Sequence, residues 1–256
     1  MNIINAAVLG IVEGITEFLP ISSTGHMVLA SELMHLAQSE FVKSFEIIIQ
    51  LGAILAVVVL FWKKYATDWQ CLGKAIIAFI PTGILGYLFY KTVRQYIGNE
   101  YVILWALLLG GLFIIIFEHY YETDEIYEGD ISVITNRQAI GIGVLQSVSM
   151  IPGVSRSAIT IISGLAMGIP RKAIVECSFI LAVITMLAAT GYDFMKNFNS
   201  FSIDQFDLLA IGFILSFITA IFAVKFMIKY IQKHTFKAFG YYRIIVAVLF
   251  WFIILR

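Results

Sequence analysis

Long uncharged apolar runs recur along almost the whole chain and leave few choices of fold. Runs of roughly 16 to 22 residues are long enough to cross a bilayer as helices. They lie near 44–62, 75–90, 101–117, 173–192, 208–228 and 238–255. Of the 256 residues, 60% are hydrophobic and 13% are charged, which leaves little polar surface for a soluble domain. We therefore predict an all-α polytopic membrane protein with six transmembrane helices in a single membrane domain, residues 1–256.

Two other apolar segments, near 5–37 and 138–169, are each interrupted by a hydroxyl-rich junction. Each divides into two arms of about 13 to 14 residues, which is too short to cross a bilayer. Arms of this length suit a re-entrant hairpin that enters the membrane and returns to the same face. We predict two re-entrant helical hairpins in addition to the six spans.

The two predicted hairpins resemble each other in sequence, and each precedes three predicted spans. Because three is odd, the second copy must enter the membrane from the opposite face, as in inverted-topology repeats. The predicted repeats cover about 1–118 and 138–256, joined by an acidic linker, 118–137. Overlaying 10–27 on 143–160 pairs Gly10 with Gly143, Glu13 with Gln146, Thr16 with Ser149, Ile21 with Val154, Ser22 with Ser155 and Thr24 with Ser157.

Lysine and arginine predict the orientation of this topology. Most loop cations fall on the face opposite the mouth of the first hairpin, which the positive-inside rule makes cytoplasmic. Both termini and that mouth are then expected outside. The formal net charge is zero, so we expect no nucleic-acid partner. The cations on the predicted cytoplasmic face are Lys63, Lys64, Lys74, Arg171, Lys172, Lys229, Lys233 and Lys237.

Glu13 and Glu17 are four residues apart, so on a helix they share one face. A carboxylate at membrane depth costs about 2.5 to 3.5 kcal/mol on insertion scales, so two together need a compensating partner. One interpretation is a polar pair that reaches the nearer interface. The other is a functional pair, in which both carboxylates hold a hard divalent cation or one acts as a base.

Three hydroxyls in succession, Ser22, Ser23 and Thr24, follow Pro20 at the first junction. They could simply cap the next helix, although one cap needs only one of them. A helix N-terminus inside the membrane also offers free N–H groups and a partial positive charge to an anion such as phosphate. Ser155 follows Pro152-Gly153 at the second junction, so two such N-termini are expected to converge.

Arg156 lies at the expected deepest point of the second hairpin, where a lone arginine is costly without an anionic partner. That partner could be Glu13 or Glu17 in a structural salt bridge, or a phosphate bound by two guanidinium N–H groups. His26 shares a helical face with the hydroxyls and could be a general acid or base, or structural.

Glu46 and Gln50 form a further polar pair four residues apart inside the first predicted span. Buried there, they are expected to support the site through a polar network. Gly110 and Gly111 could allow close helix packing, within one chain or in a possible homodimer.

The motifs EGITEFLPISSTGH and PGVSRSAIT, with the stretch FEIIIQLGAILAVVVLFW, resemble the undecaprenyl-pyrophosphate phosphatase family of bacteria, the bacitracin-resistance type. The resemblance implies a cell-membrane hydrolase that removes the terminal phosphate of the long-chain prenyl pyrophosphate carrier of cell-wall synthesis. It also implies a divalent cation, Mg²⁺ or Ca²⁺. By the same resemblance Glu13 and Glu17 are metal-linked, Ser23 is the nucleophile with Thr24 and His26 alongside, and Ser155, Arg156 and Thr160 bind phosphate. We predict Glu13, Glu17, Ser23, His26 and Arg156 as catalytic, and expect Ser22, Thr24 and Ser157 to bind substrate as well.

The residues by themselves leave two alternatives open. The nucleophile could be Ser23, deprotonated with help from His26 or Glu17, or it could be an activated water. The inverted-repeat plan is also used by secondary transporters and would suit a lipid flippase. Two hydroxyl-rich junctions with two glutamates exceed what anion binding needs, so we favour the hydrolase, with the head group processed on the outer side.

Overall fold

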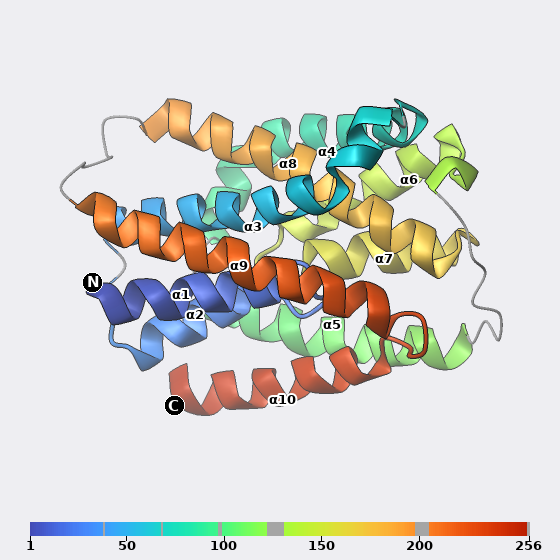
Figure 1. Ribbon diagram of the computed structural model, residues 1–256. Helices are drawn as coiled ribbons and strands as arrows, with labels where there is room; N and C mark the ends of the chain where they lie inside the picture. Colours follow the sequence, from blue (N-terminus) through green and yellow to red (C-terminus); the bar gives the residue numbers. More distant parts are fainter. Residues whose placement is uncertain (38, 68, 97–98, 122–130, 198–204, 255–256) are drawn as a thin grey trace.

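All secondary structure in the described part of the chain is helical. The computed structural model describes all residues except 38, 68, 97–98, 122–130, 198–204 and 255–256 (Figure 1). The α-helices are α1 (Ile3–Thr16), α2 (Ser23–Leu33), α3 (Glu40–Thr67), α4 (Trp69–Tyr96), α5 (Glu100–Tyr120), α6 (Asn136–Gln146), α7 (Arg156–Ala166), α8 (Arg171–Asn197), α9 (Phe206–Tyr230) and α10 (Lys237–Ile254). Two short 3₁₀-helices, η1 (Ile131–Val133) and η2 (Ser147–Met150), complete the set.

Six of these helices, α3, α4, α5, α8, α9 and α10, are long and apolar enough to cross a membrane. This confirms the six predicted spans and the all-α fold class. Each observed span extends beyond or closely matches the run expected from the sequence. The spans are Phe41–Lys64, Trp69–Val93, Glu100–Tyr120, Arg171–Tyr192, Phe206–Tyr230 and Lys237–Ile254.

The remaining α-helices form two folded-back pairs, α1 with α2 and α6 with α7. With 14, 11, 11 and 11 residues, each is shorter than a bilayer at 1.5 Å of rise per residue. The pairs occupy opposite halves of the molecule, and their tips meet near its middle (Figure 1). The tips are the two hydroxyl-rich junctions of the sequence, while re-entry into the membrane stays a prediction.

The long helices are packed in matching partnerships. Helix α9 packs against both α1 and α3. In the same way, α4 packs against α6 and α8, which are the counterparts of α1 and α3 in the second predicted repeat. Helices α5 and α10 pack on each other. These partnerships are those expected of two interlocked copies of one five-helix unit. The inverted orientation and the repeat boundaries stay predictions.

Gly110 and Gly111 allow α5 to approach α10 within one chain. A Cβ atom at Gly111 would lie 2.8 Å from the carbonyl oxygen of Gly240, and one at Gly110 would overlap the Arg243 guanidinium. Of the two packing alternatives considered above, these glycines therefore serve the contact inside the chain. A homodimer stays a prediction.

Gly143→Ala is expected to lower the thermal unfolding midpoint of the detergent-solubilised protein. A Cβ atom there would overlap the backbone carbonyl of Ala78 in α4, and backbone cannot rotate away. Overpacking of this kind costs about 1 to 3 kcal/mol. The matched control is Gly191→Ala, because a Cβ atom at Gly191 meets nothing within 4 Å. Equal midpoints for the two variants would contradict the close α4–α6 approach.

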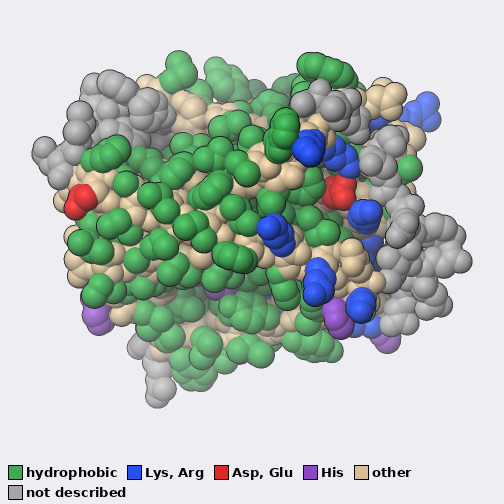
Figure 2. Space-filling model, in the orientation of Figure 1, with side chains coloured by type: hydrophobic (Ala, Val, Ile, Leu, Met, Phe, Trp, Pro, Cys, Tyr) green, Lys and Arg blue, Asp and Glu red, His purple; other side chains and the backbone are tan. Residues whose placement is uncertain are grey.

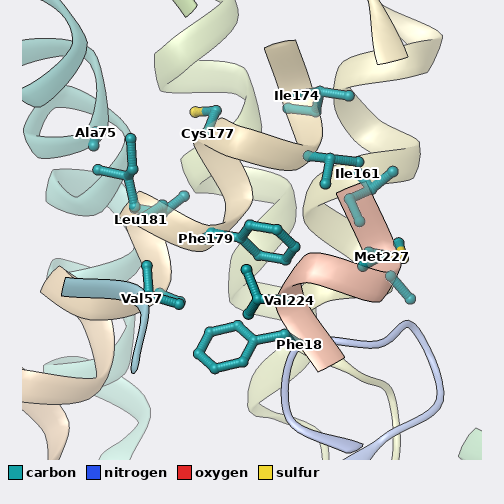
Figure 3. Close-up of a cluster of buried hydrophobic side chains, with 14 of the residues drawn as sticks. Phe18, Val57, Ala75, Ile161, Ile174, Cys177, Phe179, Leu181, Val224 and Met227 are labelled. Atoms are coloured by element: carbon teal, nitrogen blue, oxygen red, sulfur yellow. The ribbon is translucent and has the colours of Figure 1, made fainter. Parts of the chain in front are cut away.

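The first tip is anchored in the main apolar core. Phe18 is fully buried and its ring packs edge-on against Phe179 of α8, with 5.5 Å between centroids (Figure 3). Val57 of α3 and Val224 of α9 belong to the same cluster. This packing holds the chain at Phe18 in the core, and Glu17, the residue directly before it, is buried with 8% of its surface exposed.

The surface in Figure 2 is largely hydrophobic, as expected for a face in contact with lipid. Its Lys and Arg side chains gather toward the end of the molecule where α9 meets α10 (Figures 1 and 2). This uneven distribution matches the loop charges used above to predict a cytoplasmic face. The orientation itself stays a prediction.

Candidate active site

Both tips end in a serine with the same unusual backbone conformation. Ser22 has φ 73° and ψ 98°, and Ser155 has φ 73° and ψ 110°. Each hydroxyl caps the following helix, accepting from the N–H of Gly25 or of Ala158 at 3.4 and 3.3 Å. A positive φ is costly for a residue with a Cβ and persists only where its surroundings enforce it. The capping interpretation therefore holds for both serines, and their helix N-termini start at the tips.

Ser157 joins the second tip to the first. Its hydroxyl donates to the carbonyl oxygen of Leu19 at 2.8 Å and lies 3.1 Å from the Ser155 hydroxyl. The side chain is fully buried. Ser157 thus contacts the opposite tip, so the N-termini of α2 and α7 are held close to each other.

Glu17 links the two hairpins at the centre of the site. One of its oxygens, Oε2, accepts from the Ser23 hydroxyl at 2.5 Å. The other, Oε1, accepts from Nη2 of Arg156 at 3.1 Å, which forms a salt bridge between side chains exposed by 10% or less. The structure therefore contains the ion pair considered above. It also brings a hydroxyl, a carboxylate and a guanidinium from three helix ends into one cluster.

Arg156 retains capacity to bind an anion. Its Nη1 donates to the carbonyl oxygen of Ser178 at 2.9 Å, and its guanidinium lies 5.8 Å from the Phe18 ring centroid. Its buried Nε has no hydrogen-bond partner among the described residues. A buried N–H group without an acceptor is costly, so Nε is suited to donate to a further acceptor.

Glu13 lies in the protein interior beside Glu17, with 3% of its surface exposed, so both carboxylates of the pair are buried. Its Oε1 has no hydrogen-bond partner in the described part of the chain. Glu46 of α3 is near enough to act on Glu13 electrostatically, and Gln50 follows one turn later on α3. Two buried carboxylates of like charge repel each other, and either a bound cation or a proton on one of them relieves that repulsion.

This donor set fits a hard divalent cation. No group of three or more His, Cys, Asp and Glu side chains in the described residues could hold a metal ion alone. Mg²⁺ commonly takes one or two protein carboxylates and completes its shell with water and substrate phosphates. Glu13, with its unpaired oxygen, matches that requirement, and Glu17, whose oxygens accept from Ser23 and Arg156, is the second carboxylate beside it.

His26 has both ring nitrogens engaged away from Ser23. Nδ1 lies 2.8 Å from the carbonyl oxygen of Ser22, and Nε2 lies 2.8 Å from the Tyr242 hydroxyl. A carbonyl only accepts, so Nδ1 carries the proton and Nε2 faces the tyrosine O–H. The ring also stacks on Tyr242. Of the two bases considered for Ser23, the structure places Glu17 in contact and His26 in a supporting position.

Thr160 is fully buried; its hydroxyl donates to the Arg156 carbonyl oxygen at 2.8 Å and lies 3.3 Å from Gln146 Oε1. Gln146 in turn donates to Thr82 and Thr185, both at 3.2 Å. Thr160 therefore supports the helix turn of Arg156. Thr24, by contrast, is exposed next to Ser23. In the alignment of the two hairpins, Gln146 corresponds to Glu13. The second hairpin therefore has a neutral amide where the first has a carboxylate, and both ends of that amide are hydrogen-bonded.

Two residues of α10 that the sequence analysis did not assign complete the site. Tyr242 holds His26, and Arg243, with none of its surface exposed, donates to carbonyl oxygens of both tips. A signal for Arg243 was present. It is a lone cation within an apolar span, which is as costly there as Arg156 in its hairpin.

Comparisons with known proteins cover almost the whole chain. The model of the family described as bacitracin resistance protein BacA matches residues 6–249. A protein from Aquifex aeolicus is 50% identical over 246 residues, 96% of each chain. One from Sulfurihydrogenibium sp. is 46% identical over 251 residues, 98% of this chain and 99% of the relative. One from Persephonella marina is 48% identical over 250 residues, 98% of each. All three relatives are named undecaprenyl-diphosphatase. The chain therefore belongs to the BacA family.

Proposed function

We propose that this protein is a membrane undecaprenyl-diphosphatase that converts undecaprenyl pyrophosphate into undecaprenyl phosphate and inorganic phosphate. The observation that carries the proposal is the contact of Ser23 with Glu17, which also pairs with Arg156 from the opposite hairpin. The proposed nucleophile, its proposed proton acceptor and the cation proposed to bind phosphate belong to this cluster. The names of the relatives support the same substrate.

Ser23 is the proposed nucleophile and Glu17 its base. The Ser23 oxygen attacks the terminal phosphorus while its proton passes to Glu17. The bond from that phosphorus to the bridging oxygen breaks, and undecaprenyl phosphate leaves. Water then attacks the phosphoserine phosphorus and the bond from phosphorus to the Ser23 oxygen breaks. Glu17 returns its proton to that oxygen, which restores the Ser23 hydroxyl, and inorganic phosphate with the water oxygen and its protons leaves. Attack by water in the first step remains the competing route.

Arg156 and the two helix N-termini bind the diphosphate. Phosphoryl transfer depends on neutralising negative charge on the phosphate oxygens, and a guanidinium can contact two of them at once. We propose that substrate binding moves the Arg156 contact from Glu17 to phosphate. That exchange satisfies the unpaired Nε and frees Glu17 to accept the Ser23 proton.

A divalent cation, Mg²⁺ or Ca²⁺, is proposed to bind at Glu13 and Glu17. When bound, it would neutralise charge on the diphosphate oxygens. Glu46 and Gln50 of α3 would support Glu13 from the neighbouring helix. His26 would fix the start of α2 through its bond to the Ser22 carbonyl.

Glu13→Gln is expected to weaken metal binding while leaving the fold intact, because glutamine retains the shape but not the charge. The Mg²⁺ concentration that gives half-maximal activity should rise at least about tenfold. Mn²⁺ binding, followed by electron paramagnetic resonance, should weaken in parallel. Glu32→Gln, an exposed glutamate of α2, is the control and should match the wild type. An unchanged metal requirement in Glu13→Gln would remove Glu13 from the metal site.

The head group is proposed to enter from the outer side of the bacterial cell membrane, with both termini outside. The uneven distribution of lysine and arginine supports this orientation. A thiol introduced near the N-terminus should react with an impermeant maleimide in intact spheroplasts. Labelling only after the membrane is opened would reverse the orientation.

The direct test of function is release of inorganic phosphate from undecaprenyl pyrophosphate by purified protein with Mg²⁺ in detergent. We expect turnover to require Mg²⁺ and the intact Ser23–Glu17 pair. A transporter or flippase on the same plan would need no hydroxyl bonded to a buried carboxylate. A folded protein that releases no phosphate from this lipid would refute the proposal.

A further inference from the structure

Arg243 is a fully buried arginine near the middle of α10, and its guanidinium is surrounded by backbone oxygens. All the hydrogen bonds that the structure gives it among the described residues go to main-chain carbonyls. They come from α5, from the first tip and from the second tip. The acceptors are Ala106 at 2.7 Å, Leu107 at 3.4 Å, Pro20 at 3.5 Å, Gly153 at 2.9 Å and Val154 at 3.1 Å.

The chemistry of arginine explains why this position needs it. A guanidinium has five N–H donors in a rigid plane and stays charged when buried. The carbonyl dipoles that point at it compensate for the lost hydration. A lysine offers three donors from one atom and could not reach carbonyls from three separate segments. Arg243 therefore joins segments that are distant in sequence through one flat group.

The tip carbonyls that accept from Arg243 lie one or two residues before the serines that cap α2 and α7. Pro20 precedes Ser22 by two residues, and Val154 is the residue immediately before Ser155. Those two serines have the same positive φ of 73°. Arg243 thus contacts the backbone at the points that set where α2 and α7 begin, and hence where Ser23 and Arg156 stand relative to each other.

Gly110 of α5 provides the space for this arrangement. A Cβ atom at Gly110 would overlap Nη2 of Arg243 and lie 2.9 Å from its Cζ. The guanidinium is the far end of a flexible side chain, so an added methyl group would shift its position without removing its positive charge. Gly110 therefore offers a way to disturb the contact without substituting Arg243.

We propose that Arg243 is a positioning residue that holds the two tips at the separation at which Ser23 and Arg156 act on one diphosphate. This inference rests on the proposed phosphatase function. Arg243 acts through the tips, because its N–H groups are occupied by backbone carbonyls. Its loss should therefore lower kcat and leave KM for the lipid nearly unchanged.

The test compares phosphate release and detergent unfolding midpoints for Arg243→Lys and Arg171→Lys. Arg171 is an arginine with a side chain 11% exposed that pairs with Glu118 at 2.6 Å, away from the tips. A misplacement of about 1 Å can cost roughly 100-fold in rate. We expect kcat to fall by about that factor in Arg243→Lys. In Arg171→Lys the unfolding midpoint in detergent should fall, while kcat per folded molecule stays at the wild-type value.

Gly110→Ala decides the question if Arg243→Lys does not fold. We expect kcat to fall between about 10- and 100-fold with KM unchanged, because the guanidinium is displaced but present. Gly191→Ala is the control, since a Cβ atom there meets nothing within 4 Å. Wild-type kcat in Gly110→Ala, or in a folded Arg243→Lys, would overturn the inference. An inactive wild-type protein would instead refute the proposed function.

Discussion

Ser23→Ala is expected to reduce phosphate release from undecaprenyl pyrophosphate by roughly 1,000-fold or more, because the variant has no oxygen to attack phosphorus. Ser23 donates to Glu17 at 2.5 Å but does not cap α2, a role that belongs to Ser22. The substitution should therefore leave the unfolding midpoint close to that of the wild type. Single-turnover phosphate release in detergent measures the effect.

Ser31→Ala is the matched control, because it removes a hydroxyl from the same helix. Ser31 is buried, with 1% of its surface exposed, and its oxygen has no hydrogen-bond partner among the described residues. Its variant should turn over like the wild type. Substantial residual activity in Ser23→Ala would assign the attack to water and reduce Ser23 to a group that orients Glu17.

Arg156→Lys is expected to lower kcat by roughly 100- to 1,000-fold although the positive charge is conserved. Arginine reaches Glu17 and the Ser178 carbonyl with different nitrogens and keeps Nε for a further acceptor. A lysine ammonium is a single point and cannot make the two-pronged contact with phosphate. Steady-state kinetics with the lipid substrate and Mg²⁺ would show the loss.

A second measurement separates phosphate binding from a purely structural salt bridge. If Arg156 serves only to neutralise Glu17, lysine can replace it, and near-normal turnover should result. If it binds phosphate, competitive inhibition by inorganic pyrophosphate should weaken together with kcat. Arg171→Lys, which alters the ion pair with Glu118 away from the tips, should leave that inhibition unchanged.

The six spans and the two short helical pairs could be predicted because their signals are local. Length and uninterrupted hydrophobicity define a span, and a proline or glycine followed by serine marks each tip. The close association of Glu17 with Arg156 was one of the alternatives considered, since both are costly in an apolar chain without a partner. The final geometry shows which glutamate makes the contact.

The supporting residues could not be predicted from patterns of this kind. His26 shares a helical face with the serines, but its ring turns toward Tyr242, 216 residues away in sequence. Thr160 lies in the second motif, yet it is buried against Gln146 and the Arg156 backbone. Contacts between residues this far apart in sequence depend on how α10 and α6 pack against the tips. The hydrophobic periodicity of the sequence does not encode that packing.

The sequence by itself determined the fold class, the number of spans and the two polar tips, because hydrophobic length and the cost of buried charge act locally along the chain. Only the tertiary structure decided which groups meet: Ser23 with Glu17, Glu17 with Arg156, and Arg243 with the carbonyls of both tips. The physical reason is that hydrogen bonds reach about 3 Å. Such contacts exist only after the core around Phe18 and the approach of α5 to α10 have brought distant segments together.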